Sequence, residues 1–535
     1  MFIKKKMNES GSCSILLVET KRIAGRKHPV PRVIRTFGSA KNKKGVASLL
    51  KQAKTYKANL EAASPKAKTL KITSDLDIKS CISQNVGFSD IYGTAFDKVF
   101  SKLDLKSNLL KQLRDLVIMR IASPASKHKT CKLAGEYGIT CKVDSIYKMM
   151  DQITNPAIKK IKKTIYDNTV KLLAEEKRTV DVLFYDLTTV YFENSNQNEL
   201  CNFGFSKDGK HTHVQIMLAV IVTTDGLLID CKEFPGNCYE GHTLIPVLGE
   251  IKERYNIDKV VLVADAALMN KINLEELNNQ NIKYIISARI KNAKNKAGIL
   301  DIENYQTISK SANEDGTFEE IKSKTIELGT NDFLIAYHST KRARKDEKDR
   351  ERDLEKIKKH VQSTAKSKLT CALRKSYVIV SKNCKMEINE EKLALEKRFD
   401  GFFGLRTNIK EIKPLEFLSS YRGLWQIEQT FRVAKTSLEI RPVFHYTPRR
   451  IKAHFAICYM ALALVRHVGF ILKTQNNHIP TEELHLLLDK IRVTQLVDYK
   501  DNLFEILENP PEELPFIYQA LNTKPPQKFS CKPNL

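Results

Sequence analysis

One carboxylate stands where an apolar stretch of the sequence ends. Residues 179–193 read TVDVLFYDLTTVYFE, and those before Asp186 are mainly β-branched, aromatic or aliphatic, as in a strand covered on both faces. Burying a carboxylate there is energetically unfavourable unless a positive charge lies beside it. That charge could come from a lysine, a helix N-terminus or a metal ion. We expect a metal ion, with further carboxylates supplied from elsewhere in the chain. Glu193, at the end of the stretch, is expected to be a surface residue.

Two further acids lie in segments that could carry them to Asp186. Asp265 ends another apolar run, KVVLVA, and Glu428 lies within YRGLWQIEQTFRVAK (421–435), which we predict to be one helix. Spacings of three and four place five of its residues on one stripe: Tyr421, Leu424, Glu428, Phe431 and Lys435. Packing alone would favour leucine at the position of Glu428. The alternative to a functional role for Glu428 is an ion pair between Glu428 and Lys435, two helical turns apart and partly exposed.

The elements between these acids follow a recognisable order. The pattern predicts three strands, a helix, a strand, a helix and a strand, at 180–186, 213–223, 227–234, 243–254, 259–264, 271–280 and 282–288. An Asp-Gly turn at 225–226 indicates a hairpin between the second and third strands. This β-β-β-α-β-α-β order is that of an RNase H-like domain. The expected fold class is therefore mixed α/β, a mixed sheet flanked by helices.

Shifts in composition divide the chain into six expected regions. These are a basic hairpin and helix (1–71), a helical DNA-binding region (72–176), the first part of the core (177–289), an inserted subdomain (290–400), the second part with the glutamate helix (401–475) and a helical tail (476–535). Region 1–71 has 18 Lys and Arg against 3 Asp and Glu, and its two strands flank a basic turn, AGRKHP. For 72–176 the alternative is a packing domain with a solvated basic face, and for 290–400 a disordered linker.

The overall charge points to a polyanionic partner. The formal net charge is +27, which is typical of proteins that bind nucleic acid, although many basic proteins bind nothing in particular. The 11 cysteines are scattered without zinc-ligand spacing, which favours reduced thiols in a cytoplasmic protein. We expect the protein to be associated with the nucleoid. We expect no signal peptide, because the opening MFIKKKM is followed by polar residues. The apolar segment 453–472 contains His454, Arg466 and His467, so we expect a buried helix and no membrane partner.

Taken together, these residues resemble a known family. Asp186 in FYDLTTVYFE, Asp265 in VVLVADAALMN and Glu428 in YRGLWQIEQTFRVAK look like the acids of a DDE transposase. The likeness is to insertion-sequence enzymes with the signature Tyr-x2-Arg-x3-Glu-x6-Lys, called YREK, which Tyr421, Glu428 and Lys435 match in place. Flanking segments are similar too: GFSKDGKHTHVQ (204–215), DGLLIDCKEFPGN (225–237), DGFFGLRTN (400–408) and RPVFHYTPRRIKAHFAICYMALAL (441–464).

The resemblance implies an activity and its partners. Such enzymes cleave and join DNA strands with two Mg²⁺ ions, for which Mn²⁺ can substitute, and carboxylates hold these ions. Asp186 would bridge both ions, while Asp265 and Glu428 would each complete one. Tyr421, Lys435 and Arg422 would contact phosphates beside the scissile bond. The partners implied are double-stranded DNA, as inverted-repeat ends and target, and a second copy of the chain when DNA is bound.

The sequence also departs from the family pattern. Leu424 occupies the position of the signature arginine, with Arg422 two residues earlier, and Ala266-Ala267-Leu268 replaces the usual glycine-containing text after the second acid. Trp425, the only tryptophan, is expected in the core. Three other functions stay open. A structure-specific nuclease of the same fold would cut without joining, a catalytically inactive relative would only bind DNA, and an RNA-directed ribonuclease would need an RNA-binding module that the sequence does not indicate.

Overall fold

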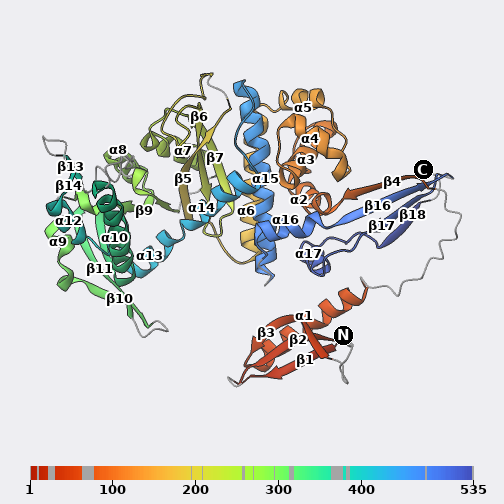
Figure 1. Ribbon diagram of the computed structural model, residues 1–535, viewed down its shortest axis with the longest axis horizontal. Coiled ribbons are helices and arrows are strands. Elements are labelled where there is room, and N and C mark those ends of the chain that lie inside the picture. Colours follow the sequence, from red (N-terminus) through yellow and green to blue (C-terminus); the bar gives the residue numbers. More distant parts are fainter. Residues whose placement is uncertain are drawn as a thin grey trace.

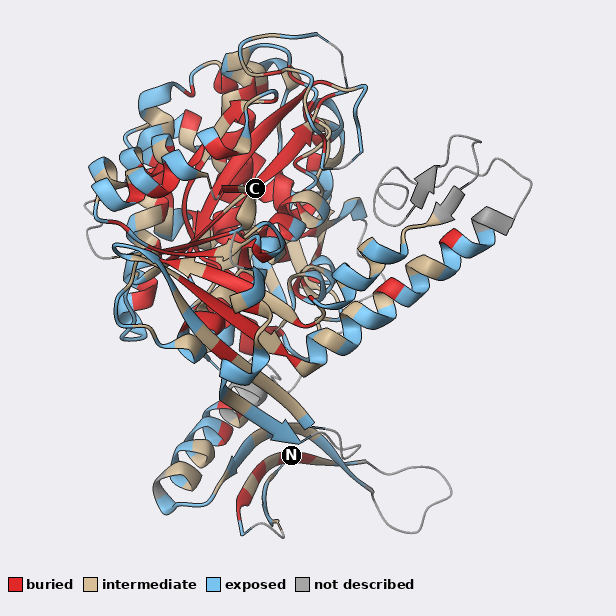
Figure 2. Cartoon of the chain, turned by 90° about the vertical axis from the view of Figure 1, so that its left-hand side faces the viewer, coloured by how far each residue is buried: buried red, intermediate tan, exposed pale blue. Residues whose placement is uncertain are grey.

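The computed structural model shows a long mixed sheet packed between helices (Figure 1). It describes residues 2–8, 11–21, 30–62, 78–193, 196–207, 209–255, 260–268, 270–293, 296–312, 318–362, 378–380, 386–475, 479–499 and 501–532. The basic turn AGRKHP lies outside these residues. Buried residues concentrate in the central sheet and in the helices against it, whereas the long helix that projects from the body is mostly exposed (Figure 2).

The centre of the sheet has the expected RNase H-like topology. It contains β5 (Val182–Tyr191), β6 (Gln215–Val222), β7 (Leu228–Pro235), β8 (Val261–Ala264) and β9 (Lys283–Ala288). Their order in space is β7-β6-β5-β8-β9, with β6 antiparallel to both neighbours and β5, β8 and β9 parallel. The expected fold class is therefore confirmed, as is the hairpin between β6 and β7.

Alternation along β5 assigns its side chains to two cores. Leu183, Tyr185 and Leu187 pack with α7 (Leu244–Tyr255) and α8 (Lys271–Asn279). Phe184 and Val190 belong to the large core on the other face, which includes α14 (Trp425–Arg432) and α15 (Pro448–Thr474). Because side chains alternate along a strand, residue 186 faces the same side as Phe184. The first acid therefore faces the helices that carry Glu428.

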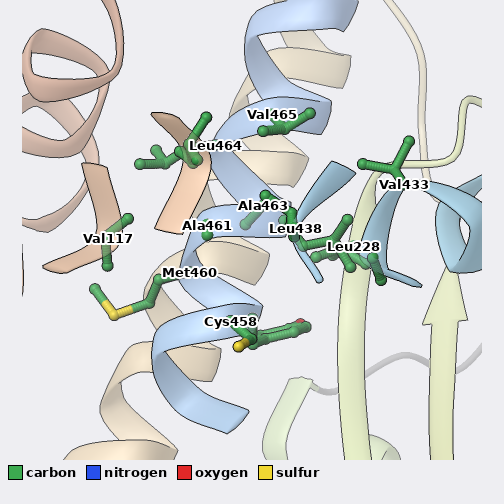
Figure 3. Close-up of a cluster of buried hydrophobic side chains, with 14 of the residues drawn as sticks. Val117, Leu228, Val433, Leu438, Cys458, Met460, Ala461, Ala463, Leu464 and Val465 are labelled. Atoms are coloured by element: carbon green, nitrogen blue, oxygen red, sulfur yellow. The ribbon is translucent and has the colours of Figure 1, made fainter. Parts of the chain in front are cut away.

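Helix α15 is the centre of this large core (Figure 3). By length and composition it could cross a membrane, yet 83% of its most apolar window is buried inside the protein. It packs against α3 (Ser107–Ala122) and α6 (Asn155–Glu175). The prediction of a buried helix over 453–472 is confirmed.

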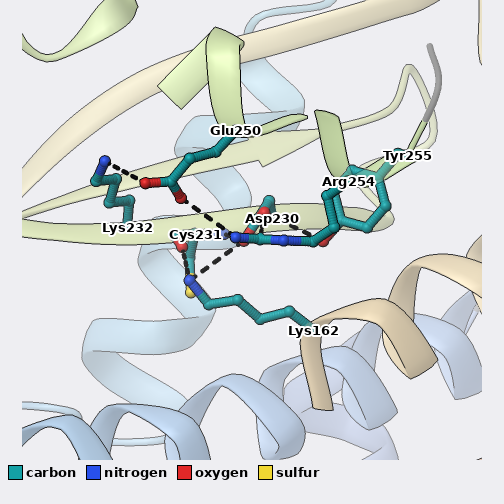
Figure 4. A network of polar contacts seen from close by, with 7 residues as sticks. All are labelled: Lys162, Asp230, Cys231, Lys232, Glu250, Arg254 and Tyr255. Carbon is teal, nitrogen blue, oxygen red and sulfur yellow. Dashed lines mark hydrogen bonds and ion pairs between the residues drawn. The ribbon is translucent and has the colours of Figure 1, made fainter. Parts of the chain in front are cut away.

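A polar network joins α6, β7 and α7 (Figure 4). Asp230 of β7 is buried and accepts hydrogen bonds from Arg254 and from the Tyr255 hydroxyl, the latter at 3.1 Å. The Lys162 ammonium of α6 lies 3.3 Å from the same carboxylate. One buried anion thus balances two cations from separate helices, and these contacts hold both helices against the edge of the central sheet.

The inserted region extends the central sheet. After β9 come β10 (Gln306–Ala312), β11 (Phe318–Gly329), β12 (Asp332–Ser339), α10 (Thr340–Gln362), β13 (Val378–Val380), β14 (Met386–Ile388), α12 (Glu390–Lys397) and β15 (Phe402–Thr407). The sheet continues from β9 in the order β15-β12-β11-β10, all antiparallel. Segment 290–400 is therefore not a separate layer. Its charged helix, α10, is exposed along most of its length (Figure 2).

The predicted helical tail is wrong. Residues 476–535 contain α16 (Thr481–Asp489), β16 (Arg492–Asp498), β17 (Leu503–Leu507), α17 (Leu514–Ala520) and β18 (Phe529–Lys532). The three strands form a sheet with β4 (Ile78–Asn85), in the order β18-β17-β16-β4. Strand β4 itself lies in a region expected to be helical. Local periodicity missed these strands because each is stabilised by pairing with distant residues rather than by an apolar run of its own.

The N-terminal region has one strand more than the predicted hairpin. Its sheet contains β1 (Phe2–Met7), β2 (Cys13–Lys21) and β3 (Val30–Ala40), and α1 (Lys43–Ala62) follows. The next region holds α2 (Thr94–Phe100), α3, α4 (Lys127–Leu133), α5 (Val143–Met150) and α6. The N-terminal unit contacts the rest of the chain through Arg35, whose guanidinium lies 4.6 Å from the ring of Phe516 on α17.

Candidate active site

The two aspartates lie side by side at neighbouring strand positions. Strands β5 and β8 are parallel, and Tyr185 is opposite Ala264, so Asp186 and Asp265 are the next residues along each strand. Both share a face with residues of the large core, Phe184 and Val263. Each carboxylate accepts a hydrogen bond at 2.7 Å from the following backbone N–H, of Leu187 and Ala266 respectively. The sheet alone therefore brings together residues that are far apart in sequence.

The surroundings of Asp186 favour its protonated form. The pKa of this carboxyl is raised to about 6, mainly by burial and to a smaller extent by the nearby charges of Asp265 and Glu240. The Leu187 N–H and the Lys207 ammonium oppose this rise. An acid with one adjacent carboxylate and incomplete compensation is suited to receive a cation. Asp265, by contrast, is exposed.

Two residues that the sequence did not single out stand next to Asp186. The Lys207 ammonium donates to the carbonyl of Leu187 at 2.9 Å and lies 3.0 Å from the Glu240 carboxylate. Its backbone N–H donates to the hydroxyl of Thr189 at 3.2 Å. Lys207 belongs to the segment GFSKDGKHTHVQ and Glu240 follows β7. Both positions lie in loops without periodicity, so only the flanking resemblance pointed to the first.

A short turn connects the surroundings of the two aspartates. It begins at Glu240, and its Thr243 hydroxyl accepts a hydrogen bond from the Tyr185 hydroxyl at 2.7 Å. The Asn273 side chain donates both to Gly241 O at 2.8 Å and to Leu268 O at 3.0 Å. The turn is thus bonded to the strand of Asp186 and to the loop that follows Asp265, which fixes their relative position.

The glutamate helix is broken, and the prediction of one helix over 421–435 is wrong. Helix α13 (Pro414–Arg422) ends before Gly423, α14 follows, and a π-helical turn covers Val433–Ser437. A Cβ on Gly423 would lie 2.5 Å from the Phe184 ring, so only glycine allows this close approach to β5. Beyond this turn at Gly423, α14 packs against β5 and β6.

Glu428 lies on the exposed side of α14. Ile427 and Phe431 are buried in the large core, whereas Glu428 is exposed. Tyr421, at the end of α13, lies near both acids, because Asp265 and Glu428 each raise the pKa of its hydroxyl, after burial as the main cause. Hydrogen bonding to Ser287 and the charge of Arg342 oppose that shift. Tyr421 therefore lies near both the second and the third acid.

The remaining predicted residues lie on α13, on α14 and the turn after it, and just beyond β5. Arg422 is exposed at the last position of α13. Lys435 is partly buried within the π-helical turn. Trp425 is not in the core as expected: it is 54% exposed, because it shares a side of α14 with Glu428, three residues later. Glu193 is exposed, as predicted.

The donor atoms suit a hard divalent cation, although the third acid is not at coordinating distance. Among the described residues, no group of three His, Cys, Asp or Glu side chains is close enough to hold a metal ion. The adjacent carboxylates of Asp186 and Asp265 provide the oxygen ligands that such ions prefer. The site thus contains a two-carboxylate centre, with Glu428 on the helix packed over the same face of the sheet.

Comparison with known proteins adds a family match. A family model described as "Transposase DDE domain" matches residues 180–464, which is more than half of the chain and includes all three acids. No curated protein sequence matches. The cryo-EM structure of the piggyBac transposase synaptic complex with hairpin DNA is similar at 9% identity and a TM-score of 0.36, over 75% of this chain and 76% of that one. The Mos1 transposase paired-end complex with left transposon end is similar at 9% identity and a TM-score of 0.15, over 32% of this chain and 57% of that one.

Proposed function

The chain belongs to the transposase DDE-domain family, and we propose that Asp186, Asp265 and Glu428 are its catalytic acids. The protein is thus an enzyme that cleaves DNA and transfers the resulting strands. The observation that supports the assignment of residues is the side-by-side placement of Asp186 and Asp265 on parallel strands. No other pair of acids is placed in this way by β5 and β8 within the part of the chain that the structure describes.

Asp186 and Asp265 would hold divalent cations, with Mg²⁺ as the physiological ion and Mn²⁺ as a substitute. When bound, such ions stabilise both the attacking and the leaving oxygen of a phosphoryl displacement. Asp186 is the partly buried member of the pair, which suits it to bridge two ions. Glu428 would complete the set through a small displacement of α14, because the break at Gly423 separates this helix from α13.

Three residues around the acids would contact the DNA backbone. Tyr421 lies near Asp265 and Glu428 and would orient a phosphate beside the scissile bond. Lys435 supplies a mobile positive charge one turn beyond α14, and exposed Arg422 supplies another. The substrate is double-stranded DNA, as the inverted-repeat ends of the element and as the target. We propose a homodimer in the DNA complex, since two ends must be held together.

Replacing one carboxylate tests the site directly. We expect Asp186→Asn to abolish metal-dependent cleavage of element-end DNA while affinity for the same DNA in EDTA changes less than about twofold, because only a metal ligand is removed. Glu193→Gln, an exposed acid just beyond the same strand, is the matched control and should keep full activity. Unchanged cleavage by Asp186→Asn would refute the assignment.

The second candidate function is a nuclease of the same fold. A strand-transfer assay with element-end DNA and a supercoiled target separates the two, because only a transposase joins the cleaved end to the target. Hydrolysed ends without joined product would favour the nuclease. DNA binding with neither product would favour an inactive relative.

A further inference from the structure

Beyond Asp186, strand β5 leads to a surface where aromatic and cationic side chains gather. We call it the Tyr191 surface and define it by Tyr191, Phe205, Lys210, Arg441, Phe444 and Tyr446. The Tyr191 ring lies 5.6 Å from the Lys210 ammonium and 5.7 Å from the Arg441 guanidinium. Cations at this distance from a ring are within the range of cation–π attraction. Tyr191 is thus flanked by two positive charges.

Two parts of the chain that are distant in sequence are bonded together there. The Val443 N–H donates to Tyr191 O at 3.2 Å, and Phe192 and Val443 form an isolated β-bridge. The Asn198 side chain donates to Tyr446 O at 3.3 Å. These contacts attach residues 441–446 and the loop after β5 to the end of that strand. The surface is therefore built into the fold rather than formed by one loop.

The aromatic rings of this surface face solvent. Phe205 is 78% exposed, Tyr446 64% and Phe444 49%. Clustered exposed rings on a soluble protein mark an interaction surface, and adjacent cations indicate an anionic partner. Two acids of the same segments, Glu193 and Glu199, are also exposed. The combination of rings and cations fits a nucleic-acid strand better than an apolar protein face.

The surface is continuous with the catalytic strand. Lys207 follows Phe205 by two residues and donates to Leu187 O, next to Asp186. Its own N–H is bonded to Thr189, halfway between Asp186 and Tyr191. Tyr191 lies five residues beyond Asp186 and on the other face of β5, so a DNA strand would reach the Tyr191 surface past Lys207 rather than along one face of the strand.

We propose that the Tyr191 surface binds unpaired nucleotides of the DNA strand that passes through the active site. The exposed rings of Phe205, Phe444 and Tyr446 stack on bases, and Lys210 and Arg441 contact the phosphates between them. Stacking on aromatic side chains accepts any base, and each stack contributes about 1–3 kcal/mol, which corresponds to about 5- to 150-fold in affinity. This inference rests on the proposed function, since it assumes that the acids of β5 act on DNA.

The test compares two DNA probes bound by the full chain in EDTA, so that no cleavage occurs. One is a blunt duplex, and the other is the same duplex with a 3′ single-stranded extension of about ten nucleotides carrying 2-aminopurine. We expect Phe205→Ala and Tyr446→Ala to weaken binding of the extended probe about tenfold each and to restore its fluorescence, while affinity for the blunt duplex stays within about twofold. Tyr499→Ala, which removes a 71% exposed ring between β16 and β17, is the matched control. It should change neither the affinity for the two probes nor the fluorescence of the extended probe.

Other outcomes would overturn the inference. Equal loss of affinity for both probes, or no loss, would show that the rings do not stack on unpaired bases. A changed sedimentation coefficient with unchanged affinity for the extended probe would assign the surface to a second copy of the chain. Failure of the proposed function has a different result, because wild-type protein would then bind the extended probe normally yet neither cleave nor join element-end DNA.

Discussion

Asp186 combines two demands that conflict in the metal-free protein. Its position on β5 places the carboxylate beside Asp265, where a divalent cation needs it. The same position buries it and raises its pKa from 3.8 to about 6. A group whose pKa is higher in the folded state stabilises the fold below its unfolded pKa and loses that contribution as the pH rises through the folded value. The position that suits Asp186 to bind a cation therefore lowers the free energy of unfolding of the metal-free protein at neutral pH.

Neutralising this residue should therefore stabilise the protein. We expect Asp186→Asn to raise the free energy of unfolding in EDTA at pH 8 by about 1–2 kcal/mol, after allowance for partial exposure, because the ionised carboxylate is the unfavourable form. Below about pH 4, where the carboxyl is protonated in both states, the gain should vanish. Urea unfolding at the two pH values measures the difference, and an equal effect at both would show that the raised pKa is not its cause.

At the scale of elements, the close approach of the turn between α13 and α14 to strand β5 depends on one glycine. We expect Gly423→Ala to destabilise the fold by about 1–3 kcal/mol and to reduce cleavage, because its Cβ would displace the Phe184 ring and with it α14. Gly249→Ala is the control: it lies on α7 with nothing within 4 Å of the added Cβ, and it should be neutral or slightly stabilising. Thermal unfolding and the cleavage assay report both effects. If Gly423→Ala had the same stability as the wild type, the Phe184 ring would be able to move away from the added Cβ at little cost in free energy.

A second element-scale prediction concerns the network that joins α6, β7 and α7. Asp230→Asn leaves the buried Lys162 and the partly buried Arg254 without their shared anion, so we expect a loss of about 3–5 kcal/mol in the free energy of unfolding. Asp104→Asn removes the exposed ion pair between Asp104 and Lys160 of α6, and it should cause no measurable change in the free energy of unfolding. Similar denaturation midpoints for the two variants would contradict the importance of the network.

The sequence predicted the elements that are determined by their own residues. Strand β6 is buried at every residue, so its apolar run was sufficient, and the Asp-Gly turn fixed the hairpin with β7. The close approach at Gly423 could not be predicted, since the ring that it meets belongs to Phe184, a residue distant in sequence. The exposure of Trp425 follows from the side of α14 that it shares with Glu428, not from its hydrophobicity. Lys207 and Glu240 lie in loops, where spacing carries no information.

At the scale of the whole molecule, the C-terminal region completes the main core. Leu484 and Leu488 of α16 and Ile517 and Tyr518 of α17 are buried in the same cluster as α15. We expect a chain ending at residue 475 to lose cooperative unfolding and to bind a hydrophobic dye, because this apolar surface would be exposed. A chain beginning at residue 78 removes the N-terminal sheet and serves as the comparison; it should still unfold in one transition. A cooperative transition in the chain ending at 475 would contradict this.

The pairing of β4 with β16 also sets a condition on biosynthesis. Asn85 lies opposite Arg492, so β4 leaves the ribosome more than 400 residues before its partner strand does. At a translation rate of about 5–20 residues per second, this interval lasts about 20–80 s. During that time the exposed Ile78 and Ile82 of β4 belong to an unpaired strand edge, the kind of segment that chaperones bind and that neighbouring nascent chains can capture. Yield in the cell should therefore depend on how quickly the ribosome reaches β16.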